Sequence, residues 1–130
     1  MLRRRLKHLA PTFAEVGTLQ DFLPVCRVED LEVERGAAAL VHGQAIALFR
    51  TPDGQVHALS NHDPYDAHTA GLARGIVGRR GEVPFVASPR HGHAFDLRTG
   101  RCLDDAAVVV AVFEVRVDDG MVHVGPRRPV

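Results

Sequence analysis

Residues 88–100 read Ser-Pro-Arg-His-Gly-His-Ala-Phe-Asp-Leu-Arg-Thr-Gly, and this stretch decides the fold. It joins a loop of the form Pro-x-His-Gly to a hairpin of the form Phe-Asp-x-x-Thr-Gly. Glycine at the end of such a turn adopts backbone angles that other residues avoid, and Asp and Thr side chains bond the nearby backbone. The stretch therefore predicts short strands at 94–97 and 101–103, on either side of a tight turn.

A second polar loop lies upstream of this stretch. It reads Asn61-His62-Asp63-Pro64-Tyr65 and follows an apolar segment at 56–59 that predicts a strand. A Pro after Asp is typical of turn initiation, so the segment leaves the strand as a loop.

The two loops together resemble the cluster-binding loops of Rieske iron–sulfur proteins. In that family the first loop carries Cys-x-His, the second carries Cys-Pro-x-His-Gly, and these side chains bind a [2Fe–2S] cluster. The alignment places Asp63 and Ser88 at the cysteine positions, and Tyr65 and His91 at the histidine positions. Oxygen ligands are poor substitutes for thiolate at an iron–sulfide site. The resemblance thus implies the Rieske fold without its cofactor, with Asp63, Ser88 and His91 side by side.

The composition is that of an ordinary soluble protein. The chain has 130 residues, 45% of them hydrophobic, with a formal net charge of zero, which predicts a single domain and gives no reason to expect nucleic acid or membrane. We expect a cytoplasmic protein. Cys26 and Cys102 stand alone in their segments, so we expect reduced, buried thiols, although a disulfide between them is possible.

Short apolar runs broken by turn signals predict an all-β fold, an antiparallel β-sandwich with an inserted two-loop lobe. A basic tail spans 1–22, with a short turn expected at 18–22. The Rieske-like domain spans 23–125 with its lobe at about 61–103, and a C-terminal tail spans 126–130. The expected strands are 24–28, 38–41, 45–50, 55–59, 75–78, 83–87, 94–97, 101–103, 108–117 and 121–124.

Several side chains of the lobe allow more than one interpretation. His91 is either a surviving metal ligand or a histidine hydrogen-bonded within a polar tip. Tyr65 either fills the space left by the cluster or is exposed as an interface anchor. Imidazole and carboxylate groups that could bind zinc or ferrous iron also occur in the loops, at His62, Asp63, Asp66, His68, His91 and His93. No catalytic triad is expected.

A Rieske-like chain with Asn-x-Asp-Pro-aromatic and Ser-Pro-x-His in place of the ligand motifs resembles the small subunit of the assimilatory NAD(P)H-dependent nitrite reductase. Cys102-Leu103-Asp104-Asp105 after the Thr-Gly turn fits that family too. The resemblance implies a non-catalytic chain without cofactors that supports a large subunit carrying FAD, an iron–sulfur cluster and sirohaem. Arginine and aromatic side chains are favoured at interfaces, and the candidates for binding that partner are Tyr65, Arg79, Arg80, Arg90 and His91.

Two other functions remain open from the sequence. The first is a Rieske-type ferredoxin that carries electrons on a [2Fe–2S] cluster, against which the residues Asp63, Tyr65 and Ser88 argue. The second is a stand-alone metal-binding module built from the loop histidines.

Overall fold

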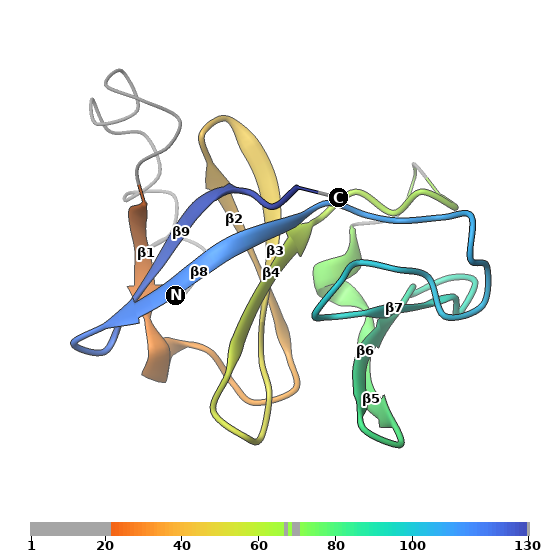
Figure 1. Ribbon diagram of the computed structural model, residues 1–130, viewed down its shortest axis with the longest axis horizontal. Coiled ribbons are helices and arrows are strands. Elements are labelled where there is room, and N and C mark those ends of the chain that lie inside the picture. Colours follow the sequence, from red (N-terminus) through yellow and green to blue (C-terminus); the bar gives the residue numbers. More distant parts are fainter. Residues whose placement is uncertain (1–21, 67, 69–70, 130) are drawn as a thin grey trace.

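The computed structural model describes residues 22–66, 68 and 71–129 (Figure 1). A six-stranded antiparallel sheet has the order β1-β9-β8-β4-β3-β2, and a three-stranded antiparallel sheet has the order β5-β6-β7. The strands are β1 (Leu23–Arg27), β2 (Gly36–Val41), β3 (Gln44–Arg50), β4 (Val56–Ser60), β5 (Ile76–Arg80), β6 (Val83–Ala87), β7 (Ala94–Asp96), β8 (Val112–Asp118) and β9 (Met121–Arg127). The predicted all-β fold with antiparallel strands and an inserted lobe is therefore confirmed.

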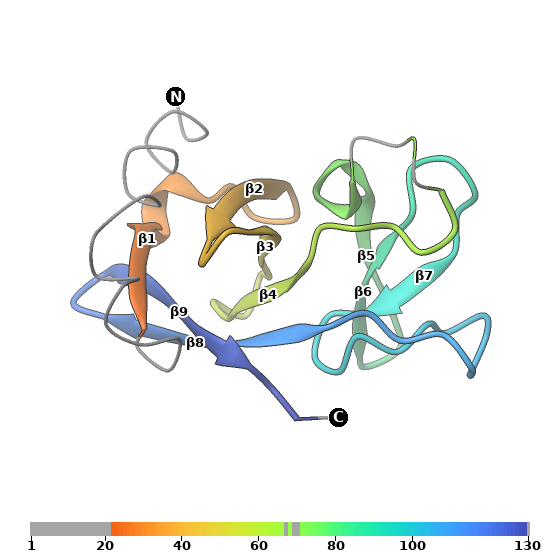
Figure 2. The same cartoon turned by 90° about the horizontal axis from the view of Figure 1, so that it is seen from above.

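The smaller sheet and its loops form the lobe, which is inserted between β4 and β8 and lies beside the larger sheet (Figure 2). Two short 3-10 helices, which no sequence pattern predicts, complete the described elements: η1 (Val28–Asp30) and η2 (Leu72–Arg74). The helix η2 attaches the lobe to the larger sheet. A side chain at Gly36 on β2 would overlap the backbone of Ala73, so the small residue is what allows this close approach.

Strand β3 connects two hydrophobic cores because its side chains alternate between the faces of the sheet. Ile46 and Leu48 point into the core enclosed by the larger sheet, together with residues such as Cys26 and Val122. Ala47 and Phe49 point the other way, into a core shared with the lobe. The lobe contributes to that second core the residues Leu72, Val86, Phe95, Leu97, Cys102 and Val110. Both faces of β3 are thus buried, which explains its uninterrupted apolar sequence.

The two cysteines lie in different cores. Cys26 belongs to the core of the larger sheet and Cys102 to the core shared with the lobe, and both are buried. The two cysteines do not form a disulfide with each other, as expected. In the part of the chain that the structure describes, no helix is long and apolar enough to cross a membrane.

Most predicted strands lie within two residues of the observed ones, and three segments differ more. The strand expected at 108–117 begins at Val112, because residues 108–110 make only scattered bonds to the hairpin, including the isolated bridge between Arg101 and Val109. The segment 101–103 forms isolated bridges in place of a strand. Strand β9 continues through Arg127, beyond the predicted start of the tail at 126. The basic tail and the turn expected at 18–22 lie outside the described residues, apart from Phe22.

The Phe-Asp-x-x-Thr-Gly hairpin is closed by Asp96. Its backbone carbonyl accepts the N–H of Gly100 at 2.7 Å, and its carboxylate accepts the backbone N–H of Arg98 at 2.8 Å and the guanidinium of Arg98 at 3.1 and 3.2 Å. Burial by itself raises the pKa of Asp96, but the hydrogen bonds and charge of Arg98 outweigh it and hold the pKa below its usual value. Gly100 has a φ of 80°, and a side chain there would overlap the carbonyl of Val110.

The lowered pKa of Asp96 predicts a pH-dependent contribution to stability. A carboxylate with a depressed pKa stabilises the fold above its unfolded pKa, about 3.9, and that contribution disappears as the pH falls through its folded pKa. We expect Asp96→Asn to lower the free energy of unfolding by roughly 1 kcal/mol at neutral pH. The difference from the wild-type protein should shrink below about pH 4. Urea denaturation across this pH range measures it, and a difference that stays constant would contradict the assignment.

Candidate functional site

The two loops of the lobe are joined by a hydrogen bond between buried side chains. The hydroxyl of Ser88 donates to Oδ2 of Asp63, and these residues are only 3% and 2% exposed. The other carboxylate oxygen of Asp63 accepts the backbone N–H of Tyr65 at 2.9 Å. The second loop is closed by its own backbone, because the N–H of Ser88 donates to the carbonyl of His93 at 2.8 Å. Asp63 and Ser88 thus lie together, as the sequence predicted.

Tyr65 lies within the lobe as a half-buried side chain. Its ring stacks on that of His93, with centroids 3.7 Å apart and planes at 8°. Its hydroxyl donates towards Sγ of Cys102 at 3.6 Å and lies 3.3 Å from Oδ2 of Asp105. The hydrogen bond to Cys102, together with burial and the charge of Asp105, raises the pKa of Tyr65 well above its usual value. Of the two interpretations of Tyr65, the structure supports the interior one.

His91 lies at the exposed tip of the lobe and contacts Asp66 of the first loop. Its Nε2 is 3.6 Å from Oδ2 of Asp66, and Nη1 of Arg90 is 3.3 Å from the same oxygen. The backbone N–H of His68, followed by the charges of Arg90 and His91, lowers the pKa of Asp66. Within the described residues His91 makes no hydrogen bond to Asp63 or Ser88. Asp66, Arg90 and His91 therefore form an ion-paired tip that is separate from the buried pair.

The other candidate arginines are on β5, whose hairpin with β6 extends away from the two loops (Figure 1). Arg79 lies 3.7 Å from the carboxylate of Glu82. Arg80 pairs with Asp104 at 3.1 Å and lies over the ring of Phe85, 5.4 Å from its centroid. The structure therefore divides the candidate contact residues into two groups, the tip and the hairpin.

The loop histidines and carboxylates are not gathered into a metal site in the described part of the chain. There, no group of three or more His, Cys, Asp or Glu side chains is placed to hold a metal ion. Each of the loop carboxylates has partners of its own: Asp63 binds Ser88, and Asp66 binds Arg90 and His91.

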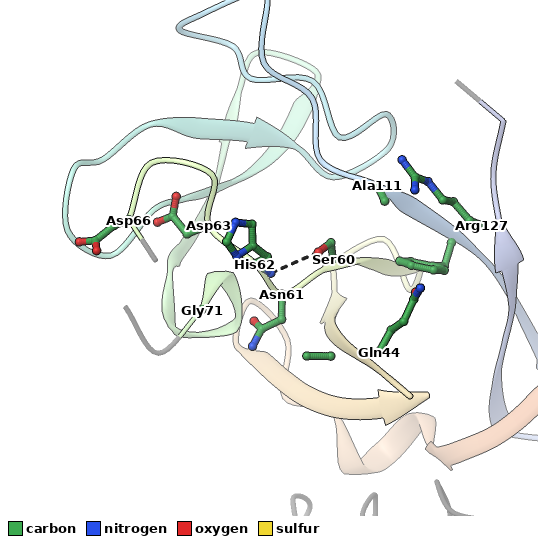
Figure 3. Close-up of a pocket in the computed structure, with 11 residues that line it drawn as sticks. Gln44, Ser60, Asn61, His62, Asp63, Asp66, Gly71, Ala111 and Arg127 are labelled. Atoms are coloured by element: carbon green, nitrogen blue, oxygen red, sulfur yellow. Dashed lines mark hydrogen bonds between the residues drawn. The ribbon is translucent and has the colours of Figure 1, made fainter. Parts of the chain in front are cut away.

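A groove adjoins the loops on the side of the larger sheet (Figure 3). It has a volume of about 460 Å³ and runs from the first loop to the ends of β8 and β9. Its lining comprises Gln44, Ala45, Ser60, Asn61, His62, Asp63, Asp66, Gly71, Ala111, Phe113 and Arg127. No motif in the sequence indicates this groove, because most of its residues lie outside the two loops' motifs and Arg127 falls in the segment expected to be a tail.

Comparison with known proteins places these loops in a family. Residues 21–125 match the model of the family described as "Rieske-like [2Fe-2S] domain". The chain is 35% identical over 100 residues to the nitrite reductase (NADH) small subunit of Escherichia coli K12, covering 76% of this chain and 92% of the relative. This chain belongs to the Rieske-like family of nitrite reductase small subunits. The predicted family is thereby confirmed.

Two further relatives extend the comparison. A solved structure from Mycobacterium tuberculosis, described as an NADH-dependent nitrite reductase small subunit, has a TM-score of 0.78 and 40% identity. The superposition covers 87% of this chain and 99% of the Mycobacterium tuberculosis chain. A nitrite reductase [NAD(P)H] large subunit from Klebsiella oxytoca is 36% identical over 101 residues, which are 78% of this chain and 10% of that protein. The polypeptide of that large subunit therefore contains a segment that resembles this chain.

The side chains at the ligand positions do not fit the cluster after which the family model is named. A Rieske cluster needs two thiolates and two imidazoles, whereas this chain offers a carboxylate, a hydroxyl, a phenol and one imidazole. Asp63 and Ser88 bond each other directly, and the hydroxyl of Tyr65 is engaged by Cys102 and Asp105. These contacts fill the meeting point of the loops with side chains, and no chemistry through a cluster follows from them.

The buried pair should hold the loops together measurably. Replacing Ser88 by Ala leaves an oxygen of Asp63 buried without its donor, so we expect the free energy of unfolding to fall by about 1–3 kcal/mol. Thr99→Ala is a matched control, because the Thr99 hydroxyl is exposed and accepts only the backbone N–H of Arg101 at 3.2 Å, a bond that water can replace, so its loss should cost less than about 1 kcal/mol. Urea denaturation compares the two, and an S88A protein as stable as the T99A protein would show that the bond is not needed.

Proposed function

We propose that this chain is the small, non-catalytic subunit of an assimilatory NAD(P)H-dependent nitrite reductase, and that it acts in the cytoplasm. In this role it binds and supports the large subunit, which reduces nitrite to ammonium. The observation that carries the proposal is similarity to nitrite reductase small subunits over 92% of a relative's length. The Klebsiella large subunit, which contains a related segment, supports a physical association between the two kinds of chain.

A supporting role agrees with the chemistry of the lobe. Nitrite reduction requires electron carriers, and the family resemblance assigns FAD, an iron–sulfur cluster and sirohaem to the large subunit. In this chain, the side chains at the cluster positions are engaged with one another and with Cys102 and Asp105. The contribution that remains for this chain is a surface of fixed shape that recognises the large subunit.

The tip of the lobe is the first candidate for that surface. Arg90 and His91 are exposed there, and both contact the same oxygen of Asp66, so the tip is ordered before a partner arrives. Ordering in advance favours affinity because less side-chain entropy is lost on binding. Tyr65 supports the tip from inside through its stack on His93. Arg79 and Arg80 would contact the partner only if the interface also covers the β5–β6 hairpin.

A titration of purified large subunit tests the proposal. We expect the wild-type chain to increase NADH-dependent nitrite consumption with a saturable dependence on its concentration, while the chain alone consumes no nitrite. Arg90→Ala should raise the half-saturating concentration about thirtyfold, which corresponds to about 2 kcal/mol. Folding should change little, because the Arg90 side chain is 65% exposed and Asp66 keeps the backbone N–H of His68 and the imidazole of His91 as partners.

Arg101→Ala serves as the matched control, since Arg101 is an exposed arginine of the same lobe that makes no ion pair within the described residues. No stimulation by the wild-type chain would contradict the proposed function. Equal half-saturating concentrations for the R90A and R101A proteins would instead show that the tip is not part of the interface, and would leave the proposed function standing.

A further inference from the structure

A bulge in the larger sheet creates an open groove beside the lobe. Strands β4 and β8 pair at Ala58–Phe113 and Leu59–Val112, and one further bond, from the backbone N–H of Ser60 to the carbonyl of Ala111 at 2.9 Å, lies at the edge of the groove. The pairing of β8 with β9 is also irregular, since Phe113 is opposite Arg127 whereas Val115 is opposite Val124. The extra residue falls on β9 near Gly125 and Pro126. Bulges of this kind redirect side chains and are frequent next to binding sites.

The groove of Figure 3 continues into a second hollow of about 280 Å³. The two share Gln44, Phe113 and Arg127, so they form one trough, which we call the β9 groove. Its outer half is lined mainly by apolar residues, namely Val41, Ile46, Phe113, Gly125 and Pro126. Its inner half, nearest the loops, carries the polar side chains of Gln44, Ser60, Asn61, His62 and Arg127.

The exposed charge of the β9 groove is positive. Of its two carboxylates, Asp63 is buried beneath the surface against the hydroxyl of Ser88, and Asp66 is paired with Arg90 and His91. Arg127 is exposed, and within the described residues its side chain has no carboxylate or carbonyl partner. The groove therefore presents a cation whose charge is not neutralised, which favours a partner with a carboxylate.

The neighbouring residue shows that Arg127 is not simply part of a frayed end. The backbone N–H of Arg128 donates to the carbonyl of Val112 at 2.8 Å, and its guanidinium donates to the carbonyl of Arg98 at 2.8 Å. A second nitrogen of the same guanidinium is 3.6 Å from the carboxylate of Glu114. The backbone at the end of β9 is thus fixed by Arg128, while Arg127 lines the groove.

We propose that the β9 groove binds an extended segment of the large subunit that places a carboxylate against Arg127 and an apolar side chain against Phe113 and Pro126. This inference depends on the proposed function, because its occupant is the large subunit. The groove is continuous with the tip of the lobe, since Asp66 lines the groove and also pairs with Arg90 and His91. Tip and groove together would form one surface, as a stable interface of about 800 Å² per partner requires.

Charge reversal at Arg127 tests the proposal by measuring the dissociation constant for purified large subunit. We expect Arg127→Glu to weaken binding at least about tenfold, because it sets a negative charge against the carboxylate of the partner. Arg127→Lys keeps the charge and should retain most of the affinity. Arg101→Glu is the matched control, a reversal at an exposed arginine of the lobe outside the groove, and it should leave the dissociation constant within about twofold.

A second measurement does not depend on whether the Arg127→Glu variant folds. A photoreactive amino acid in place of Gln44, whose side chain is exposed in the middle of the groove, should cross-link to the large subunit on illumination. The same amino acid in place of Arg101 should not. Mass spectrometry should place the cross-link on a large-subunit segment that contains Asp or Glu beside apolar residues.

The outcomes separate the inference from the proposed function. A wild-type chain that does not bind the large subunit overturns both. Wild-type binding with equal dissociation constants for the R127E and R101E proteins, or a cross-link from position 101 and none from 44, overturns the groove alone. A cross-link from position 44 to a second copy of this chain would assign the groove to self-association and also overturn the inference.

Discussion

The hydrogen bond between Ser88 and Asp63 is the contact on which the arrangement of the lobe depends. It joins two loops that are distant in sequence, at the point where the Rieske architecture has its metal centre. Both partners are buried, so neither can exchange the bond for one to water without opening the lobe. A buried polar group that loses its partner costs about 1–3 kcal/mol, and this penalty is what keeps the loops together.

Around this bond the remaining cluster positions have become part of the packing. Tyr65 fills space with its ring and reaches Cys102 and Asp105 with its hydroxyl. His91 is the exception, because it is exposed and pairs with Asp66 at the tip of the lobe. In the proposed role, the Rieske-like lobe provides a surface of fixed shape for the large subunit. That is the property expected of a subunit that recognises a redox enzyme but leaves the redox chemistry to its partner.

The sequence predicted the fold and half of the site because these depend on local patterns. The turn chemistry of the 94–103 hairpin and the alternation of short apolar runs were enough to identify the architecture. The contact between Asp63 and Ser88 followed from their aligned positions in two loops that converge in the parent fold. The location of Tyr65 could not be decided, because it depends on His93, Cys102 and Asp105, which the fold brings to it.

The end of β9 was not predicted correctly for a related reason. Its prolines are typical of a frayed terminus, yet Arg128 fixes this segment through bonds to Val112 and Arg98, which lie far away in sequence. The groove lies beside a bulge in the pairing of β8 with β9, and a bulge of this kind leaves no pattern in the sequence. Sequence patterns therefore identified the lobe, whereas the surface beside it required the three-dimensional structure.

X-ray diffraction at the iron absorption edge, from crystals of protein purified without oxygen from iron-replete cells, tests the central claim most directly. The account predicts no anomalous density between the two loops, and electron density for the Ser88 hydroxyl in contact with the Asp63 carboxylate. An anomalous peak coordinated by His91, with Asp63 and Ser88 drawn apart towards it, would show that the lobe holds iron and would contradict the account.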